Sequence, residues 1–497
     1  MAMNDSEHHY RDRAAIALLL LGVLSTTPLA HGQSSAPATL GDDDAWMEVD
    51  ASDGTGSLSA RVPPTMLDPG NDSFADQGMS SSLAPYTNGM PDRSDAAPSS
   101  SIPSGNPAAT DLLVGTGWLG ETLGVNRNGF RLAGLNITDV NAQFTGGNQP
   151  GEWTGDNLLL LGASLHLEEA IGWKGGRVGM EFLYYSGGDI NDNAGTIMGY
   201  NSLDAAPPRT RTEIYTLWFR QKLLRDKFVV HLGKLVPSYD FNNVSRAIPN
   251  LPEAYSVPSI TSSIITPLYL NPTMLGVMPG YYNSASGVMA AFKPRPDLYA
   301  QYGFYDGNLA AGRQTGLEGP HFNGYYFHIA EVGGNWNVGR KRFPGQAGAG
   351  YWRQTGVLAA ASGDVQGAEG AYLFASQRIS YEDEGVIHDG AIVWLQLAAT
   401  NSEFIDTHRM AGAGISYYGP FGKRHNDSIG FAFAYGRMNN NPAANLGRQE
   451  TIYSWYYQYQ VRKGIYLQPN WTYISTPAQS RGLDDVFALT MRAILLF

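Results

Sequence analysis

The side chains in this sequence best suited to chemistry are neutral hydrogen-bonding groups that recur at every second position near the C-terminus. Gln458 and Gln460 lie in one such segment, and Gln468, Asn470 and Thr472 lie in the next. Successive side chains of a strand point to opposite sides of its sheet, so each set would share one face. Amide and hydroxyl groups both donate and accept hydrogen bonds. Such a face can therefore bind water or an uncharged polar solute.

Charged residues on similar faces each allow two roles. Arg492 falls on the polar face of the last segment, where it could donate to solute oxygens or pair with Glu450 or another carboxylate and brace a wall. The stretch ASQRIS puts Arg378 between two serines on another polar face. His231 lies on the polar face if the apolar residues around it lie on the opposite face. A histidine at such a position is more often part of the wall than a ligand for a solute. The sequence leaves these alternatives open.

Signals for enzymes, metals and nucleic acid are weak. The region after residue 110 contains no GxSxG, HExxH or Walker motif. Cysteine is absent, which excludes disulfides, thiolate nucleophiles and Cys-ligated metals. A net charge of -12 gives no electrostatic reason to bind nucleic acid. We expect no enzyme activity, no cofactor and no metal, although a Ser/His pair that meets only in the folded chain would escape this search.

Short strands are predicted to carry these residues. From residue 111 to the end, aromatic-rich segments of about ten residues alternate with Gly, Asn, Asp and Pro clusters, which is typical of an all-β fold. The stretch HLEEAIGW, residues 166–173, fits one short helical turn. In the last segment Phe487, Leu489, Met491, Ala493, Leu495 and Phe497 share one face.

Three features favour a membrane barrel over a soluble sandwich. Trp and Tyr stand near the ends of apolar faces, as in the aromatic girdles of outer-membrane barrels. Short turns, at 223–227 and 461–464, alternate with long polar loops such as 191–210. An export signal without a following spanning helix leaves a closed barrel as the way to cross a membrane. We predict a transmembrane antiparallel β-barrel of about 16 strands (range roughly 14–18) with short periplasmic turns and long extracellular loops.

The N-terminal part has a different composition. Residues 1–32 combine Arg11 and Arg13, a short apolar run and small residues near Ala30, which is the pattern of a secretory signal peptide. Residues 33–110 hold 11 acidic and 2 basic residues with few aliphatic ones. Such a segment buries too little to offset its chain entropy, so we expect a disordered tether. The barrel domain is then 111–497.

From about Leu112 to Phe497 the chain resembles the carbohydrate-selective outer-membrane porins of Gram-negative bacteria. The likeness is strongest in QETIYSWYYQYQVRKGIYLQPNWTYISTP and the final VFALTMRAILLF. The residues that match the closing pattern of that family are Glu450, Gln468, Pro469, Tyr473, Pro477 and Arg492. Other matching stretches are LEEAIGWKGGRVGMEFL, FVVHLGKLVPSYDFNNV and AAFKPRPDLYAQYGFYDGN, while residues 117–135 depart from the family's usual opening.

The resemblance implies passive diffusion of monosaccharides such as glucose through the outer membrane into the periplasm. A sugar pore needs hydrogen-bonding groups for hydroxyls and must bind weakly enough to release its solute. The expected partners are monosaccharides, outer-membrane lipid and the barrel-assembly machinery, which would recognise the strand that ends in Phe497. A monomer and a homotrimer are both consistent with the sequence. The alternatives are a non-selective diffusion porin and, with less support, a barrel hydrolase or adhesin.

Aromatic residues at the barrel rim divide into two groups on this interpretation. Trp455 and Trp471 are expected in the girdle that faces lipid, and Tyr281 and Tyr282 are expected at the mouth of the pore. Phe497 is expected to close the lipid face of the last strand.

Overall fold

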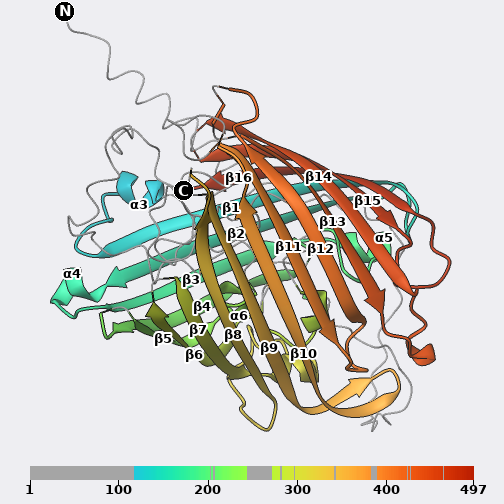
Figure 1. Ribbon diagram of the computed structural model, residues 1–497, viewed down its shortest axis with the longest axis horizontal. Coiled ribbons are helices and arrows are strands. Elements are labelled where there is room, and N and C mark those ends of the chain that lie inside the picture. Colours follow the sequence, from blue (N-terminus) through green and yellow to red (C-terminus); the bar gives the residue numbers. More distant parts are fainter. Residues whose placement is uncertain are drawn as a thin grey trace, which may run out of the picture. The chain divides into compact units, whose positions relative to one another are not determined.

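The protein forms a closed barrel of sixteen antiparallel strands, in which each strand pairs with its neighbours in sequence and β1 pairs with β16 (Figure 1). The computed structural model describes residues 117–201, 203–204, 208–225, 227–242, 271–279, 283–295, 297–340, 343–381, 389–422, 424–425, 427–462 and 464–497. The expected signal peptide at 1–32, the acidic segment at 33–110, Tyr281 and Tyr282 lie outside these residues. The prediction of about 16 barrel strands is confirmed.

The strands are β1 (Phe130–Thr145), β2 (Trp153–His166), β3 (Gly176–Ser186), β4 (Thr210–Leu223), β5 (Phe228–Leu235), β6 (Ala285–Arg295), β7 (Leu298–Asp306), β8 (Tyr326–Val338), β9 (Phe343–Ala360), β10 (Gly363–Arg378), β11 (Gly390–Thr400), β12 (Thr407–Tyr418), β13 (Ser428–Met438), β14 (Gln449–Arg462), β15 (Ile465–Ser475) and β16 (Val486–Leu496). In Figure 1 the cyan β1 lies beside the red β16, which closes the ring.

Short helical segments occupy the connections. They are α3 (Trp118–Thr122), α4 (Leu167–Ile171), α5 (Ile190–Ala194), α6 (Pro237–Asp240) and the 3₁₀ turns η5 (Pro272–Met274), η6 (Asn308–Ala311) and η7 (Pro442–Ala444). The helix α4 confirms the helical turn expected within residues 166–173, and Gly172 ends it in the left-handed conformation that glycine adopts readily. Among the described residues, no helix has the length and apolar character needed to cross a membrane.

The two ends of the barrel differ in their connections. At one end, here called the turn end, the connections are short, such as 224–227 between β4 and β5 and 463–464 between β14 and β15. At the opposite end, the loop end, long connections run over 187–209, 236–284 and 307–325. The alternation of short turns and long loops is confirmed. The hairpin at 361–362 is an exception at the loop end, since β9 and β10 are long strands that extend beyond β11 before they turn.

Side chains alternate between the outer and inner faces as expected. In β16 the side chains of Leu489 and Met491 face outward, whereas Thr490 and Arg492 are buried inside. Trp455 and Trp471 also face outward and pair directly across β14 and β15, but they lie at the middle of these strands and not near their ends.

Phe497 follows the outward parity of β16 and lies against the outer face of β1. A Cβ atom added at Gly134 would come 2.1 Å from Cε2 of Phe497, so the ring covers the space that the missing side chain leaves. The backbone of Phe497 continues the ladder, because its N–H donates to the carbonyl of Gly134 over 2.8 Å. The C-terminal aromatic therefore seals the seam between the first and last strands.

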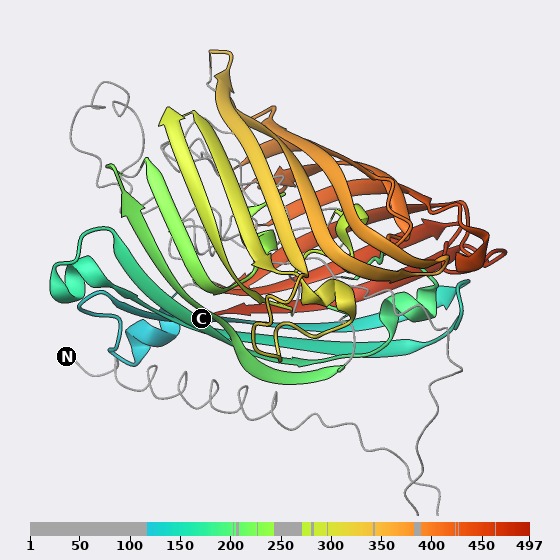
Figure 2. The same ribbon diagram turned by 90° about the horizontal axis from the view of Figure 1, so that it is seen from below.

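The barrel interior contains the described parts of two connections, residues 190–201 of the first and residues 236–242 and 271–279 of the second. In Figure 2, helical segments coloured green and yellow-green lie within the ring of strands. Side chains of these connections pack against inward-facing wall residues; the buried ones include Ile197, Met198, Tyr200, Phe241, Met274 and Met278. Leu203 and Tyr239 join a second cluster with wall residues of β1 to β4. The wide barrel is thus filled in part by its own chain.

The close fit of Phe497 on Gly134 leads to a test. A Gly134→Leu substitution would clash with the ring and with the Leu160 carbonyl, 2.8 Å from the added Cβ. Overpacking of this kind costs about 1–3 kcal/mol. We expect the folded barrel to lose its heat-modifiable gel mobility at a lower temperature. Gly155→Leu is the control, since its Cβ would meet only the Asp139 carbonyl, at 3.6 Å. Equal loss in both variants would contradict the seam argument.

Candidate solute pathway through the barrel

A buried ion pair joins the first and last strands inside the barrel. Arg492 donates from Nε to Asp139 Oδ1 over 2.7 Å and from Nη2 to Asp139 Oδ2 over 2.6 Å. The two residues are direct partners across β1 and β16, and both are at most 1% exposed. Bidentate geometry makes this the strong form of a charge-assisted pair. Of the alternatives for Arg492, the structure shows a pairing that braces the wall, and the partner is Asp139 and not Glu450.

The ion pair also anchors the first inserted connection. Asn201 donates from Nδ2 to Asp139 Oδ2 over 3.1 Å and to Asn141 Oδ1 over 2.7 Å. Asn141 accepts in addition from Thr490, at 2.5 Å, and donates to Asp156 over 3.2 Å. One polar network thus links the seam of the barrel to a loop inside it.

Glu450 holds the same connection from the opposite side. Its carboxylate accepts from Thr196 Oγ1 at 2.5 Å, from the N–H of Ile197 at 3.0 Å and from the N–H of Met198 at 3.0 Å. A fourth donor, the N–H of Ala478 at 2.9 Å, comes from the β15–β16 loop. Glu450 is fully buried. Four donors replace the water that a buried carboxylate loses, so this residue acts as a clamp for the loop.

Glu331 in β8 clamps the second inserted connection in a similar way. Its Oε2 accepts from the N–H of Asn242 at 2.7 Å and from Tyr372 at 2.7 Å. Its Oε1 accepts from Tyr299 at 2.9 Å and from Gln301 at 3.0 Å. Two carboxylates on different sides of the wall therefore each receive four hydrogen bonds and fix one loop inside the barrel.

His231 and Arg378 face the interior, where they contact protein groups. His231 lies 3.6 Å from Asp240 of α6 and meets the ring of Trp218 edge to face. Arg378 donates to the carbonyl of Asp389 over 3.1 Å and lies over the ring of Tyr381. Both positions brace connections, α6 in the first case and the β10–β11 connection in the second. A contact of either residue with solute stays a prediction.

The five neutral candidates of β14 and β15 all lie on the inner side of the wall. Asn470 accepts from Ser454 at 3.1 Å and donates to Thr472 at 3.2 Å, and Gln460 donates to the hydroxyl of Tyr466 at 2.6 Å. Gln468 and Arg492 are direct partners in the ladder between β15 and β16. Most of these groups are thus partly engaged with the wall, and their contact with solute stays a prediction.

Gln458 differs from its neighbours. Both polar atoms of its side chain are buried and have no hydrogen-bond partner in the part of the chain that the structure describes. Similar atoms on inward-facing residues of β10 to β12 are Ser376 Oγ, Gln396 Oε1 and Ser416 Oγ. Buried polar atoms without a protein partner need water or a ligand to satisfy them. These atoms of β10, β11, β12 and β14 form an arc of the wall, and their contact with solute stays a prediction.

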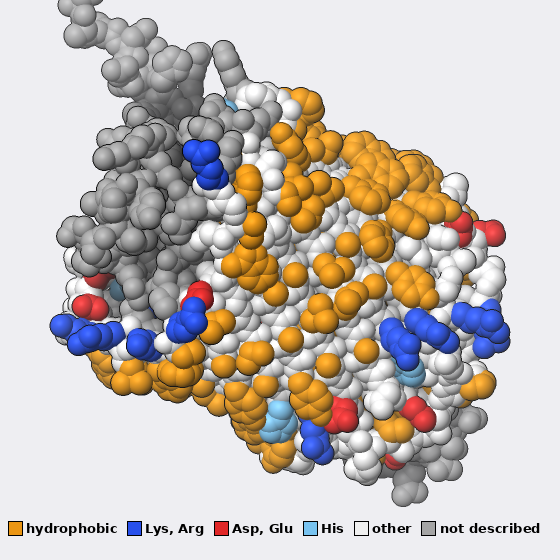
Figure 3. Space-filling model, viewed as in Figure 1, with side chains coloured by type: hydrophobic (Ala, Val, Ile, Leu, Met, Phe, Trp, Pro, Cys, Tyr) orange, Lys and Arg blue, Asp and Glu red, His pale blue; other side chains and the backbone are white. Residues whose placement is uncertain are grey.

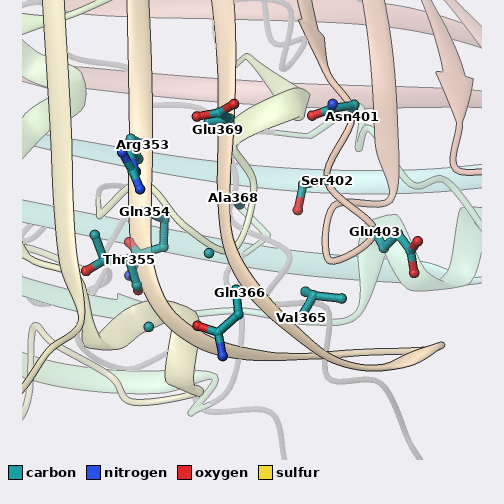
Figure 4. A pocket seen from close by; sticks show the side chains of 12 residues that line it. Arg353, Gln354, Thr355, Val365, Gln366, Ala368, Glu369, Asn401, Ser402 and Glu403 are labelled. Carbon is teal, nitrogen blue, oxygen red and sulfur yellow. The ribbon is translucent and has the colours of Figure 1, made fainter.

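A polar pocket of about 520 Å³ lies at the loop end, beside the part of β10 that extends beyond β11 (Figure 4). Arg353, Gln354 and Glu369 line it from the two long strands, and Asn401 and Glu403 line it from the β11–β12 loop. Hydroxyl, amide and charged groups surround this space, so it is a second place near the barrel mouth where a polar molecule fits. Among the described residues, no group of three or more metal-ligating side chains is suited to hold an ion.

The profile of the carbohydrate-selective porin family OprB matches residues 154–497. The chain belongs to the OprB family. It is an outer-membrane sugar porin, which agrees with the resemblance noted in the sequence. Porin B of Pseudomonas aeruginosa is similar, with 23% identity over 421 residues that cover 74% of this chain and 87% of that protein. The high-pH structure of Pseudomonas putida OprB superposes with a TM-score of 0.65 at 17% identity and covers 76% of this chain and 97% of that one, which shows a shared fold.

Two central residues of this OprB-family porin escaped the sequence analysis. Asp139 was missed because its partner lies 353 positions away in the chain. Glu331 follows Phe327 and Ile329 on the inward face of β8. An acidic residue that continues a buried apolar run must find donors, so this spacing is the signal by which Glu331 could have been found.

The seam ion pair predicts a non-additive mutant cycle. Asp139→Leu or Arg492→Met alone leaves one buried charge without its partner, which costs about 3–5 kcal/mol. The double variant removes both charges, so it should be more stable than either single variant. The measurement is thermal unfolding of the purified porin in detergent. If the two single effects simply add in the double variant, the pair contributes no coupling and this account is wrong.

The Glu450 clamp makes a prediction about the pore. Glu450→Gln replaces one acceptor oxygen with an NH₂ group, which cannot accept a hydrogen bond. The donors that faced this oxygen are then left without an acceptor. We expect residues 187–209 to loosen, so that single-channel currents become noisier and larger solutes pass. Glu403→Gln at the loop end is the control, since this carboxylate holds neither inserted connection. Unchanged currents in Glu450→Gln would show that the loop stays in place without the clamp.

Proposed function

We propose that this porin passes monosaccharides such as glucose by passive diffusion, with the loop end outside the cell and the turn end in the periplasm. Short periplasmic turns and long outer loops are the usual arrangement of bacterial outer-membrane barrels. Export through the signal peptide at 1–32 and recognition of the last strand by the barrel-assembly machinery belong to the same proposal. Membership of a carbohydrate-selective family supports it, and the name Porin B of the relative is consistent with it.

The observation that carries the solute proposal is the arc of inward-facing hydroxyl and amide atoms without protein partners among the described residues, which runs from Ser376 in β10 to Gln458 in β14. A sugar hydroxyl can donate to and accept from such a side chain, then leave, because neutral hydrogen bonds exchange readily with water. The loops fixed by Glu450 and Glu331 narrow the interior beside this arc. Narrowing forces the solute to exchange some of its water for wall contacts. The pathway then prefers small solutes with several hydroxyl groups.

Flux through the purified porin in liposomes tests this function. Glucose and xylose should pass faster than a disaccharide and faster than amino acids of similar size, and their flux should saturate. Gln458→Leu should raise the half-saturating glucose concentration several-fold, because one hydrogen bond to a neutral group is worth about 0.5–1.5 kcal/mol. Thr451→Val on the outward face of β14 is the matched control.

Passage ordered by solute size alone would contradict selectivity and favour a general diffusion porin. In that case the fold and the membrane location would stand, and the assignment of Gln458 to solute contact would fall.

A further inference from the structure

The outer wall of the barrel carries exposed arginines at its loop end. Arg353 of β9, Arg409 of β12 and Arg437 of β13 share the outward face with apolar residues of the same strands. In Figure 3, Lys and Arg side chains form a row at the lower right of the barrel wall, toward the loop end. None of the three arginines makes a hydrogen bond or an ion pair with a residue that the structure describes.

Strand register places two of these cations opposite each other. Arg409 and Arg437 are direct partners across β12 and β13. Side chains opposite each other in an antiparallel pair have Cβ atoms about 4.5–5.5 Å apart, and like charges at that spacing destabilise the sheet. Two carboxylates near this rim are engaged elsewhere, since Glu369 accepts from Tyr351 and Glu403 accepts from Ser362. An external anion between the two guanidinium groups would remove this repulsion.

The row continues along the rim to Arg353 in β9. Arg353 lies between His328 and Glu369 in the ladder, and Ala371 of β10 connects through Ala399 of β11 to Arg409. Neighbouring strands are about 4.8 Å apart, so the three steps from β9 to β12 place Arg353 roughly 15 Å from Arg409. A large anionic head group can therefore reach the arginine pair and Arg353 together.

Apolar side chains lie on the same outward face between the arginines and the middle of the barrel wall, four to six residues along the strands from Arg409 and Arg437. Leu397, Ile415 and Phe433 face outward and are more than one-third exposed. A ligand that satisfies both surfaces has an anionic head group and acyl chains. A free anion would use only the arginines, and a neutral lipid would leave them without a partner.

We propose that Arg409 and Arg437, with Arg353 as a third contact, bind the phosphate groups of an acylated, phosphorylated lipid in the outer leaflet. Each guanidinium presents paired N–H donors that match phosphate oxygens. The acyl chains lie along Leu397, Ile415 and Phe433. The loop end is the part of the barrel that meets the outer leaflet in the orientation proposed above, and the binding chemistry is independent of the solute that the pore carries.

Binding to the full-length porin in non-ionic detergent tests this site, with native mass spectrometry as the readout. The probes are lipid A with two phosphates, the same lipid without phosphates, and inorganic phosphate. Lipid A should bind the wild type in a salt-sensitive way, and Arg409→Gln combined with Arg437→Gln should weaken it at least tenfold. Arg462→Gln, which removes an exposed arginine at the turn end, should bind as the wild type does.

Three outcomes would overturn the site. Equal binding of the dephosphorylated lipid would assign the affinity to the apolar wall alone. Displacement of lipid A by inorganic phosphate at similar concentrations would mean a plain anion site. Equal loss in Arg462→Gln would mean non-specific attraction. Glucose flux confirms that the double variant is folded, and Arg409→Lys combined with Arg437→Lys, which keeps both charges, should retain part of the affinity.

Discussion

Closure of the sheet is the constraint on which the rest of this structure depends. In lipid, a strand edge would leave N–H and C=O groups without partners, so a membrane sheet must return to its first strand. Here β1 and β16 meet over ten residue pairs, and Phe497 extends the ladder to Gly134. The bidentate pair of Arg492 and Asp139 lies within this seam. The seam that closes the ring therefore also contains a buried ion pair.

A ring of sixteen strands encloses more space than wall side chains fill, and two connections enter it. Each is fixed by a carboxylate that accepts four hydrogen bonds, Glu450 for the first and Glu331 for the second. Hydrogen bonds are directional, so a carboxylate with several backbone and hydroxyl donors holds a loop at a defined position. Apolar contacts such as those of Tyr200 and Phe241 favour burial of the loop but do not fix its position. The width of the solute path therefore depends on polar anchors in the wall.

Alternate side chains of each strand face two different environments, the lipid outside the barrel and the polar interior. Outward positions of β13 carry Ile429, Phe431 and Phe433, which suit lipid, and inward positions of β14 carry Ser454 and Gln458, which suit a polar interior. Near the loop end the outward positions change to arginine and histidine, as expected where lipid head groups replace acyl chains. The same strand backbone therefore suits acyl chains, lipid head groups and a polar interior, depending only on which side chains it carries.

The fold class and the faces of the strands could be predicted from the sequence, because the alternation of side chains is a local property of each strand, whereas chain length limited the strand number only to about 14–18. The inward positions of Gln458, Gln468, Asn470, Thr472 and Arg492 followed from the alternation and are seen in the structure. Contacts between distant segments could not be predicted in this way. Arg492 pairs with Asp139 across 353 positions, and Glu450 holds Thr196 across 254. Arg492 and Asp139 meet because the strand register closes the ring, and Glu450 and Thr196 meet because a loop turns into the barrel. No local sequence pattern predicts the register or the path of the loop.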